Sequence, residues 1–196
     1  TPNYAEIILR GLITEDDFNI VAVYTQPDRP VGRKQVLTPP DVKKAALEHN
    51  IEIYQPENIN ESSEIETIKS LKPDVIVVAA YGQLVKQPLL DIAPCINLHS
   101  SILPNYRGAS PVQETLLNGD KLAGVTAMKM EIGMDSGDIL GISYLTPKES
   151  AKNDCLLENL AYAASSLTKD VLRNFAYLSP TTQHRCDASY VKKRTK

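Results

Sequence analysis

The 196-residue chain has no tryptophan, two phenylalanines and only three cysteines. Cys95, Cys155 and Cys186 lie far apart, form no C-x-x-C pair and have no closely spaced histidine pair to complement them. Neither a disulfide framework nor a zinc site is indicated by this pattern. We therefore expect a protein without a bound metal that is suited to a reducing cytoplasm.

Long apolar runs, a signal peptide and a strong charge of one sign are also missing. No run approaches the ~20 apolar residues that span a bilayer, so we expect no membrane contact. The 21 basic and 24 acidic residues leave a net charge of −3. That balance excludes binding to nucleic acid by bulk charge, and any such contact has to come from a local basic patch.

Three common motifs are absent as well. The chain contains neither G-x-G-x-x-G nor G-x-x-x-x-G-K-[ST], which disfavours nucleotide binding through a glycine-rich loop. It also lacks the G-x-S-x-G elbow of the usual serine hydrolases.

Short apolar runs alternate with amphipathic segments along the chain. We predict strands near 20–24, 51–54, 74–80, 95–99, 124–131 and 139–145, and helices near 1–14, 41–49, 61–71, 84–91, 111–118 and 154–177. This alternation predicts an α/β fold with a mostly parallel sheet flanked by helices. Residues 26–40 carry four prolines and several basic side chains, and we expect a long loop without regular structure there.

Two polar residues of the predicted strand 95–99 share one face, because side chains alternate along a strand. Asn97 and His99 would face a ligand at the carboxyl end of that strand, where open α/β sheets bind their ligands. Hydrogen bonds to loop backbone would explain the same two residues equally well.

A glycine-flanked turn, G-M-D-S-G-D, follows at 133–138. One of its carboxylates, placed near His99, would favour the protonated imidazole. Asn97, His99 and a carboxylate together suggest a site that stabilises an oxyanion and relays a proton. The alternative is a surface hairpin in which Asp135 and Asp138 are simply solvated.

The run I-N-L-H-S-S-I-L-P-N-Y-R-G-A at 96–109, followed by G-M-D-S-G-D, resembles the catalytic core of the 10-formyltetrahydrofolate-dependent formyltransferases. T-Q-P-D-R-P-V-G-R-K, P-D-V-I-V-V-A-A-Y-G-Q-L-V and S-Y-V-K-K-R-T-K are similar to segments of the members that formylate methionyl initiator tRNA. The resemblance covers the whole chain. It implies a Rossmann-like cytoplasmic enzyme of translation initiation that uses 10-formyltetrahydrofolate as formyl donor, and we expect a monomer.

The resemblance also implies roles for particular residues. Asn97, His99 and Asp135 would be catalytic, which selects Asp135 over Asp138 for that role. The pocket for the folate donor would be lined by Ala80, Tyr81, Gly82, Gly133, Met134, Ser136, Gly137 and Asp138. The initiator methionyl-tRNA would be contacted by Arg29, Arg33, Lys34 and Arg107. Without the resemblance, we would interpret residues 26–40 as an ordinary solvated loop with basic side chains.

The sequence departs from the family pattern at two places, and each departure leads to a prediction. Family members begin with a short strand before the Thr-Pro that stands here at Thr1, so we predict that the first strand of the sheet is missing from the chain. We also predict a catalytic domain over 1–188 and a basic linker over 189–196 toward a C-terminal domain that the chain does not contain.

Other interpretations of the sequence stay open. Within the family, the formyl group could go to another amine, such as a sugar nucleotide or glycinamide ribonucleotide, or to water. The chain could also be a non-catalytic RNA-binding module that kept the fold. Competition among acceptors and turnover of formyl-folate separate these possibilities.

Overall fold

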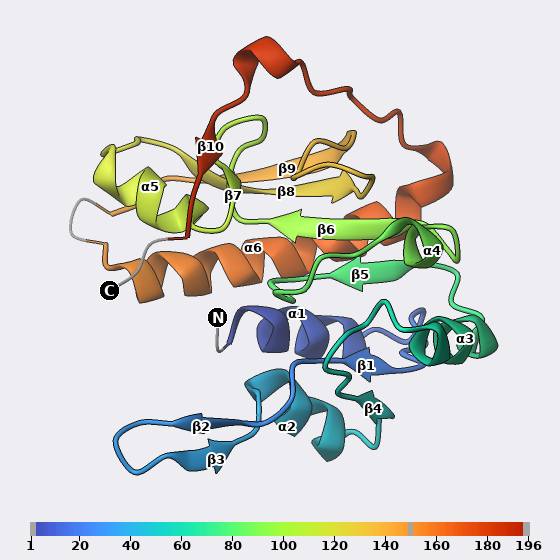
Figure 1. Ribbon diagram of the computed structural model, residues 1–196. Helices are drawn as coiled ribbons and strands as arrows, with labels where there is room; N and C mark the ends of the chain where they lie inside the picture. The colour runs from blue at the N-terminus through green and yellow to red at the C-terminus, as the bar shows by residue number, and fades with distance from the viewer. Residues whose placement is uncertain (1–2, 149–150, 194–196) are drawn as a thin grey trace.

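The computed structural model describes residues 3–148 and 151–193 (Figure 1). The helices are α1 (Tyr4–Ile13), α2 (Asp41–Glu48), α3 (Ser62–Leu71), α4 (Gln87–Leu90), α5 (Pro111–Leu117) and α6 (Asn153–Asn174), with 3-10 turns at Phe175–Tyr177 and Arg185–Asp187. The strands are β1 (Val23–Tyr24), β2 (Arg29–Val31), β3 (Val36–Thr38), β4 (Ile53–Tyr54), β5 (Ile76–Val78), β6 (Cys95–His99), β7 (Arg107–Gly108), β8 (Ala123–Lys129), β9 (Ile139–Leu145) and β10 (Tyr190–Val191). The predicted α/β alternation is confirmed.

The main sheet has four strands in the order β5-β6-β8-β9. β5 and β6 run parallel, whereas β8 is antiparallel to both β6 and β9. The sheet is therefore mixed, while the strand pattern predicts a mostly parallel one. The turn between β8 and β9 is too short for a helical crossover, so these two strands form a hairpin.

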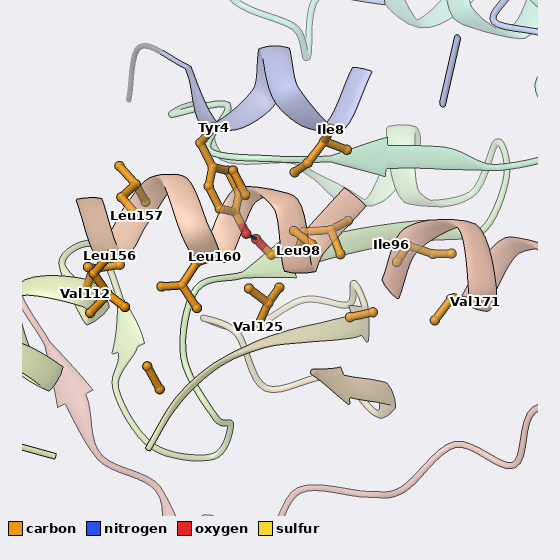
Figure 2. Close-up of a cluster of buried hydrophobic side chains, with 14 of the residues drawn as sticks. Tyr4, Ile8, Ile96, Leu98, Val112, Val125, Leu156, Leu157, Leu160 and Val171 are labelled. Carbon is orange, nitrogen blue, oxygen red and sulfur yellow. Dashed lines mark hydrogen bonds between the residues drawn. The ribbon is translucent and has the colours of Figure 1, made fainter. Parts of the chain in front are cut away.

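Strand β6 divides its side chains between two apolar clusters. Ile96 and Leu98 belong to the largest core, together with buried residues of α1, β8 and α6. Cys95 faces the opposite side and packs in a second cluster with residues of α3 and α4. Figure 2 shows the first core, where the Tyr4 hydroxyl donates to the carbonyl oxygen of Leu98 at 3.2 Å. Helices thus cover both faces, and β6 is held in place from both.

The segment 26–40 is not the irregular loop that its prolines predict. β2 and β3 pair in an antiparallel hairpin, with Arg29 opposite Thr38 and Val31 opposite Val36. Gly32 at φ +72° supplies the left-handed conformation that the turn requires. The hairpin projects from the body of the molecule in Figure 1. The prediction of no regular structure was wrong because the prolines stand at positions that a two-stranded ribbon tolerates.

A cavity of about 1190 Å³ separates the main sheet from the small sheet formed by β1 and β4. Its walls include Ile8, Leu12, residues 20–25 and residues 75–80, from α1, β1 and β5. Among the described residues, β1 and β5 each pair with a strand on one side only. Two strand edges of the described chain thus face the same cavity.

The C-terminal segment returns to the body of the fold. Tyr190 and Val191 form β10, which pairs in parallel with Arg107 and Gly108 of β7. The boundary between 188 and 189 stays a prediction, although the first residues beyond it are paired. Residues 194–196 of the predicted linker, and the Thr1-Pro2 start predicted for the first helix, lie outside the described residues. In the part of the chain that is described, no helix has the length and apolar character needed to cross a bilayer.

Candidate active site

Asn97 and His99 lie on the same face of β6, as their spacing predicts. The His99 side chain is almost completely buried, whereas Asn97 is partly accessible. Both positions are rigid, because β6 is paired with β5 on one side and β8 on the other. The sheet thus presents an amide and an imidazole side by side.

Asp135 reaches both of these residues from the turn between β8 and β9. The Asn97 amide donates to Asp135 Oδ1 at 3.3 Å, and His99 Nδ1 lies 3.7 Å from Asp135 Oδ2. Strand β8 ends beside the start of β6, where Met130 N donates to Cys95 O. The turn must therefore fold back over the face of β6, which the strand pattern does not reveal. Within the described residues, the Asp138 side chain makes no such hydrogen bond with Asn97 or His99, so the geometry favours Asp135.

The ring of His99 is oriented by a backbone carbonyl. Its Nε2 lies 2.9 Å from the carbonyl oxygen of Tyr106, which can only accept, so Nε2 carries a proton. Nδ1 then faces the Asp135 carboxylate at a distance longer than a hydrogen bond. A second proton on Nδ1 would make that contact attractive, and the resulting N–H would be available to a substrate oxygen.

Gly108 completes the surroundings of Asp135 and was not singled out by the sequence. Its backbone N–H donates to Asp135 Oδ2 at 2.8 Å. Gly108 adopts φ +111°, and a Cβ there would collide with the carbonyl oxygen of Val191. Glycine is required at this position, because the chain approaches both β10 and the carboxylate.

The residues predicted to line the folate donor lie in two neighbouring segments. Tyr81 packs in the same apolar cluster as Met130, which shortly precedes the Asp135 turn. Burial raises the pKa of Tyr81 to about 12, and the Glu64 carboxylate adds to the rise. The buried Tyr81 hydroxyl has no hydrogen-bond partner among the described residues. The positions are Ala80, Tyr81, Gly82, Gly133, Met134, Ser136, Gly137 and Asp138, of which Gly137 is buried and Met134 is 62% exposed.

The four basic residues predicted to contact tRNA are divided by the structure. Arg29, Arg33 and Lys34 are exposed on the β2–β3 hairpin. Arg107 is only 1% exposed, and its guanidinium donates to Gln183 and Tyr190. A phosphate contact by Arg107 would require these bonds to break, so we do not propose Arg107 as a tRNA contact.

Two further observations concern the surroundings of these residues. The large cavity between α1, β1 and β5 reaches Ala80 and Tyr81, but Asn97, His99 and Asp135 are not part of its lining. Among the described residues, no group of three or more His, Cys, Asp or Glu side chains is arranged to hold a metal ion.

Comparison with known proteins shows what the whole chain is similar to. The family model described as Formyl transferase matches residues 1–166. A protein of a Nitratiruptor species named methionyl-tRNA formyltransferase is 51% identical over 195 residues, which are 98% of this chain and 64% of the relative. A protein of the same name from Campylobacter fetus is 52% identical over 93% of this chain and 60% of its own length. The chain therefore spans less than two thirds of these curated relatives.

Solved structures share the fold at lower identity. A methionyl-tRNA formyltransferase from Clostridium thermocellum has a TM-score of 0.59 at 22% identity and aligns over 78% of this chain and 66% of its own. WlaRD, described as a sugar 3N-formyl transferase solved with dTDP and 5-N-formyl-THF, has a TM-score of 0.72 at 19% identity, over 98% of this chain and 67% of its own. At such identities the likeness establishes the fold alone.

Proposed function

The chain belongs to the formyl transferase family, and we propose that it transfers the formyl group of 10-formyltetrahydrofolate to the α-amine of methionyl initiator tRNA in the cytoplasm. One observation carries the proposal: Asn97, His99 and Asp135 meet at one face of β6 although Asp135 is distant in sequence. The name shared by relatives about half identical to the chain supports the choice of acceptor.

The reaction forms a bond between the methionyl nitrogen and the formyl carbon. The carbonyl oxygen becomes an oxyanion in the tetrahedral intermediate, and the bond from the formyl carbon to N10 of the folate then breaks. The attacking amine loses one proton, and the leaving N10 gains one. Atoms and charge balance without an oxidant or a reductant.

Each residue of the site has a part in these steps. The Asn97 amide has a second N–H besides the one directed at Asp135, and His99 offers Nδ1–H when its ring is doubly protonated. Both would donate to the oxyanion, where preorganised donors are most effective. Asp135 would hold the imidazole in place and relay the proton of the attacking amine to the leaving N10, directly or through water.

The acceptor is tested by direct competition. We expect formyl-labelled methionyl-tRNA to form from labelled 10-formyltetrahydrofolate, and to form faster than the formylated products of an amino-sugar nucleotide or glycinamide ribonucleotide. Release of free formate without any acceptor would measure hydrolysis. Preferential formylation of the sugar nucleotide would overturn the choice of tRNA, and binding of tRNA without turnover of formyl-folate would overturn the enzymatic role.

A further inference from the structure

Gln183 lies between Arg107 and the turn that carries Asp135, and it lies beyond the residues matched by the family model. The Gln183 side chain is almost fully buried. Its Oε1 accepts from Arg107 Nε at 3.1 Å and from Arg107 Nη2 at 2.8 Å. Its Nε2 donates to the carbonyl oxygens of Asp135 at 3.1 Å and Gly137 at 2.7 Å.

An amide suits this position better than any other side chain. A guanidinium offers only donors and a carbonyl oxygen offers only acceptors, so the residue between them must accept on one side and donate on the other. That requirement also determines which way the Gln183 amide points. Its two bonds to carbonyls hold the turn at Asp135 itself and two residues later.

The turn needs such support. Asp135 adopts φ +48°, a left-handed conformation that residues other than glycine seldom occupy. Residues in that region persist when the surrounding structure holds them there. The carboxylate of Asp135 faces Asn97 and His99 only while this conformation is kept.

Arg107 anchors the other end of the network. It is buried, so its charge must remain hydrogen-bonded, and Nη1 donates to the Tyr190 hydroxyl at 2.9 Å. The following residue, Gly108, donates its N–H to Asp135 Oδ2. Arg107 therefore connects the backbone of the turn, through Gln183, to the strand that also contacts the carboxylate.

The same C-terminal segment also holds the chain beside His99. The Ser189 hydroxyl accepts from Tyr106 N at 2.8 Å, and the Ser189 carbonyl oxygen accepts from Arg107 N at 2.9 Å. The Tyr106 carbonyl is the group that orients His99 Nε2. Residues 183–191 thus contact both segments that orient the ionisable groups of the site, and β10 lies beside β7 (Figure 1).

From these contacts we infer that Gln183, held by Arg107, is a positioning residue that keeps the Asp135 carboxylate directed at Asn97 and His99. The expected effect of Gln183 on turnover rests on the proposed formyl transfer. Its expected effect on the conformation of the turn does not. Gln183 holds the turn that carries both Asp135 and the predicted folate residue Gly137, so it affects the chemical step and the binding of folate, and not the binding of tRNA.

The test is Gln183→Glu in the full chain. A carboxylate of nearly the same size keeps the contact with Arg107, but it can no longer donate to the two carbonyls. We expect kcat to fall at least tenfold while the KM for methionyl-tRNA changes less than twofold; the KM for folate, whose predicted lining includes Gly137, should rise. By NMR, the Gly108 amide should exchange at least tenfold faster. Tyr190→Phe, at an exposed position, should give a smaller change in the same direction.

Asn60→Asp is the matched control. The Asn60 amide also donates to a backbone carbonyl, that of Leu84, and accepts from the Lys86 N–H, so this variant suffers the same chemical change elsewhere. Unchanged kcat and unchanged Gly108 exchange in Gln183→Glu would overturn the inference, as would an equal loss in Asn60→Asp. If the unmodified chain transfers no formyl group, the proposed function fails, and Gly108 exchange alone decides the positioning role.

Discussion

The Asp135 carboxylate lies next to three other residues of the site, Asn97, His99 and Gly108. Oδ1 accepts from Asn97, and Oδ2 accepts from the Gly108 N–H and faces His99 Nδ1. Both oxygens therefore have neighbours before any substrate binds. This arrangement suits a group that orients its partners. In the proposed mechanism, the second N–H of Asn97 and a protonated His99 Nδ1 would donate to the developing oxyanion.

Replacing Asn97 by alanine tests the oxyanion role. Loss of one such donor should lower kcat about 100- to 1000-fold, which corresponds to about 3 kcal/mol of transition-state stabilisation. Single-turnover formyl transfer with saturating substrates measures the effect. Asn174→Ala serves as the control, because the Asn174 amide also donates to a backbone carbonyl, at the end of α6. Near-normal transfer by Asn97→Ala would show that its amide does not stabilise the intermediate.

The three thiols should differ sharply in reactivity. Cys95 is buried in β6, and burial raises the pKa of its thiol to about 11, whereas Cys155 and Cys186 are exposed. Because the thiolate is the reactive form, we expect two thiols to react quickly with a disulfide reagent at pH 8 and the third only on unfolding. Mass spectrometry of the labelled peptides identifies them. Rapid labelling of Cys95 in the folded chain would contradict its buried position.

At the scale of elements, the β2–β3 hairpin combines basic and apolar side chains on an exposed ribbon. Val31, Val36 and Leu37 are each more than half exposed, close to Arg33 and Lys34. Exposed apolar side chains of this size beside positive charge are characteristic of an interaction surface. Such a ribbon fits the predicted contact with the acceptor end of tRNA.

Arg33→Ala should weaken the use of tRNA and leave folate alone. Removing one phosphate contact reduces the dependence of log K on log salt by about one unit. We expect a several-fold higher KM for methionyl-tRNA, a shallower salt dependence, and an unchanged KM for 10-formyltetrahydrofolate. Lys69→Ala, an exposed lysine of α3 paired with Glu66, is the matched control. Equal weakening for both substrates would point to a folding defect instead.

A cluster of ion pairs connects α6 to the turn that follows α1. Arg173 contacts Glu15 Oε2 at 2.6 Å and Asp17 Oδ2 at 2.7 Å. Hydrogen bonds from Arg173 lower the pKa of both carboxyls below their ordinary values of 4.5 and 3.8. A lowered pKa in the folded state adds stability above the ordinary pKa, and that stability is lost as pH falls through the folded value.

Arg173→Met should therefore destabilise the chain at pH 7 and do so less at acid pH. We expect the difference in Tm between the two proteins to be largest above about pH 5 and to shrink steadily toward about pH 2, because the carboxylates then take up protons in both. Thermal unfolding followed by circular dichroism over that range measures the difference. A Tm difference independent of pH would mean that packing of the Arg173 stem, not its charge, matters.

At the scale of the whole molecule, a large cavity lies between the main sheet and the small sheet of β1 and β4. Apolar side chains of α1, β1 and β5 line it, and the two strand edges face it with unpaired backbone groups on the described chain. Apolar surface and open edges of this kind cost stability and favour association. An extended segment placed between β1 and β5 would pair with both and cover the lining.

Adding residues before residue 1 tests whether an extended segment can pair between β1 and β5. About five β-branched apolar residues ahead of Thr1 should raise Tm by at least about 5 °C, since each kcal/mol moves the Tm of a domain of this size by about 2–4 °C. A glycine-serine extension of equal length is the control. Equal Tm values for the two extensions would mean that the segment does not enter the cavity.

Sequence periodicity predicted most elements, because apolar spacing directly reflects which residues are buried. It failed for the 26–40 segment, where prolines obscured a short ribbon, and for β7 and β10, whose two-residue strands carry no periodic signal. Asn97 and His99 were paired correctly, since alternation along one strand is a local property. Their roles, like those of the folate and tRNA residues, stay predictions.

Local pattern by itself determined the α/β class and the polar face of β6, because both follow from spacings within single elements. Only the tertiary structure decided where Asp135 lies, that Arg107 is buried, and that Gln183 bridges them. These facts depend on how the turn after β8 folds back and how β10 returns to β7. Contacts of that kind join segments that are distant in the chain, and no periodicity within one segment encodes them.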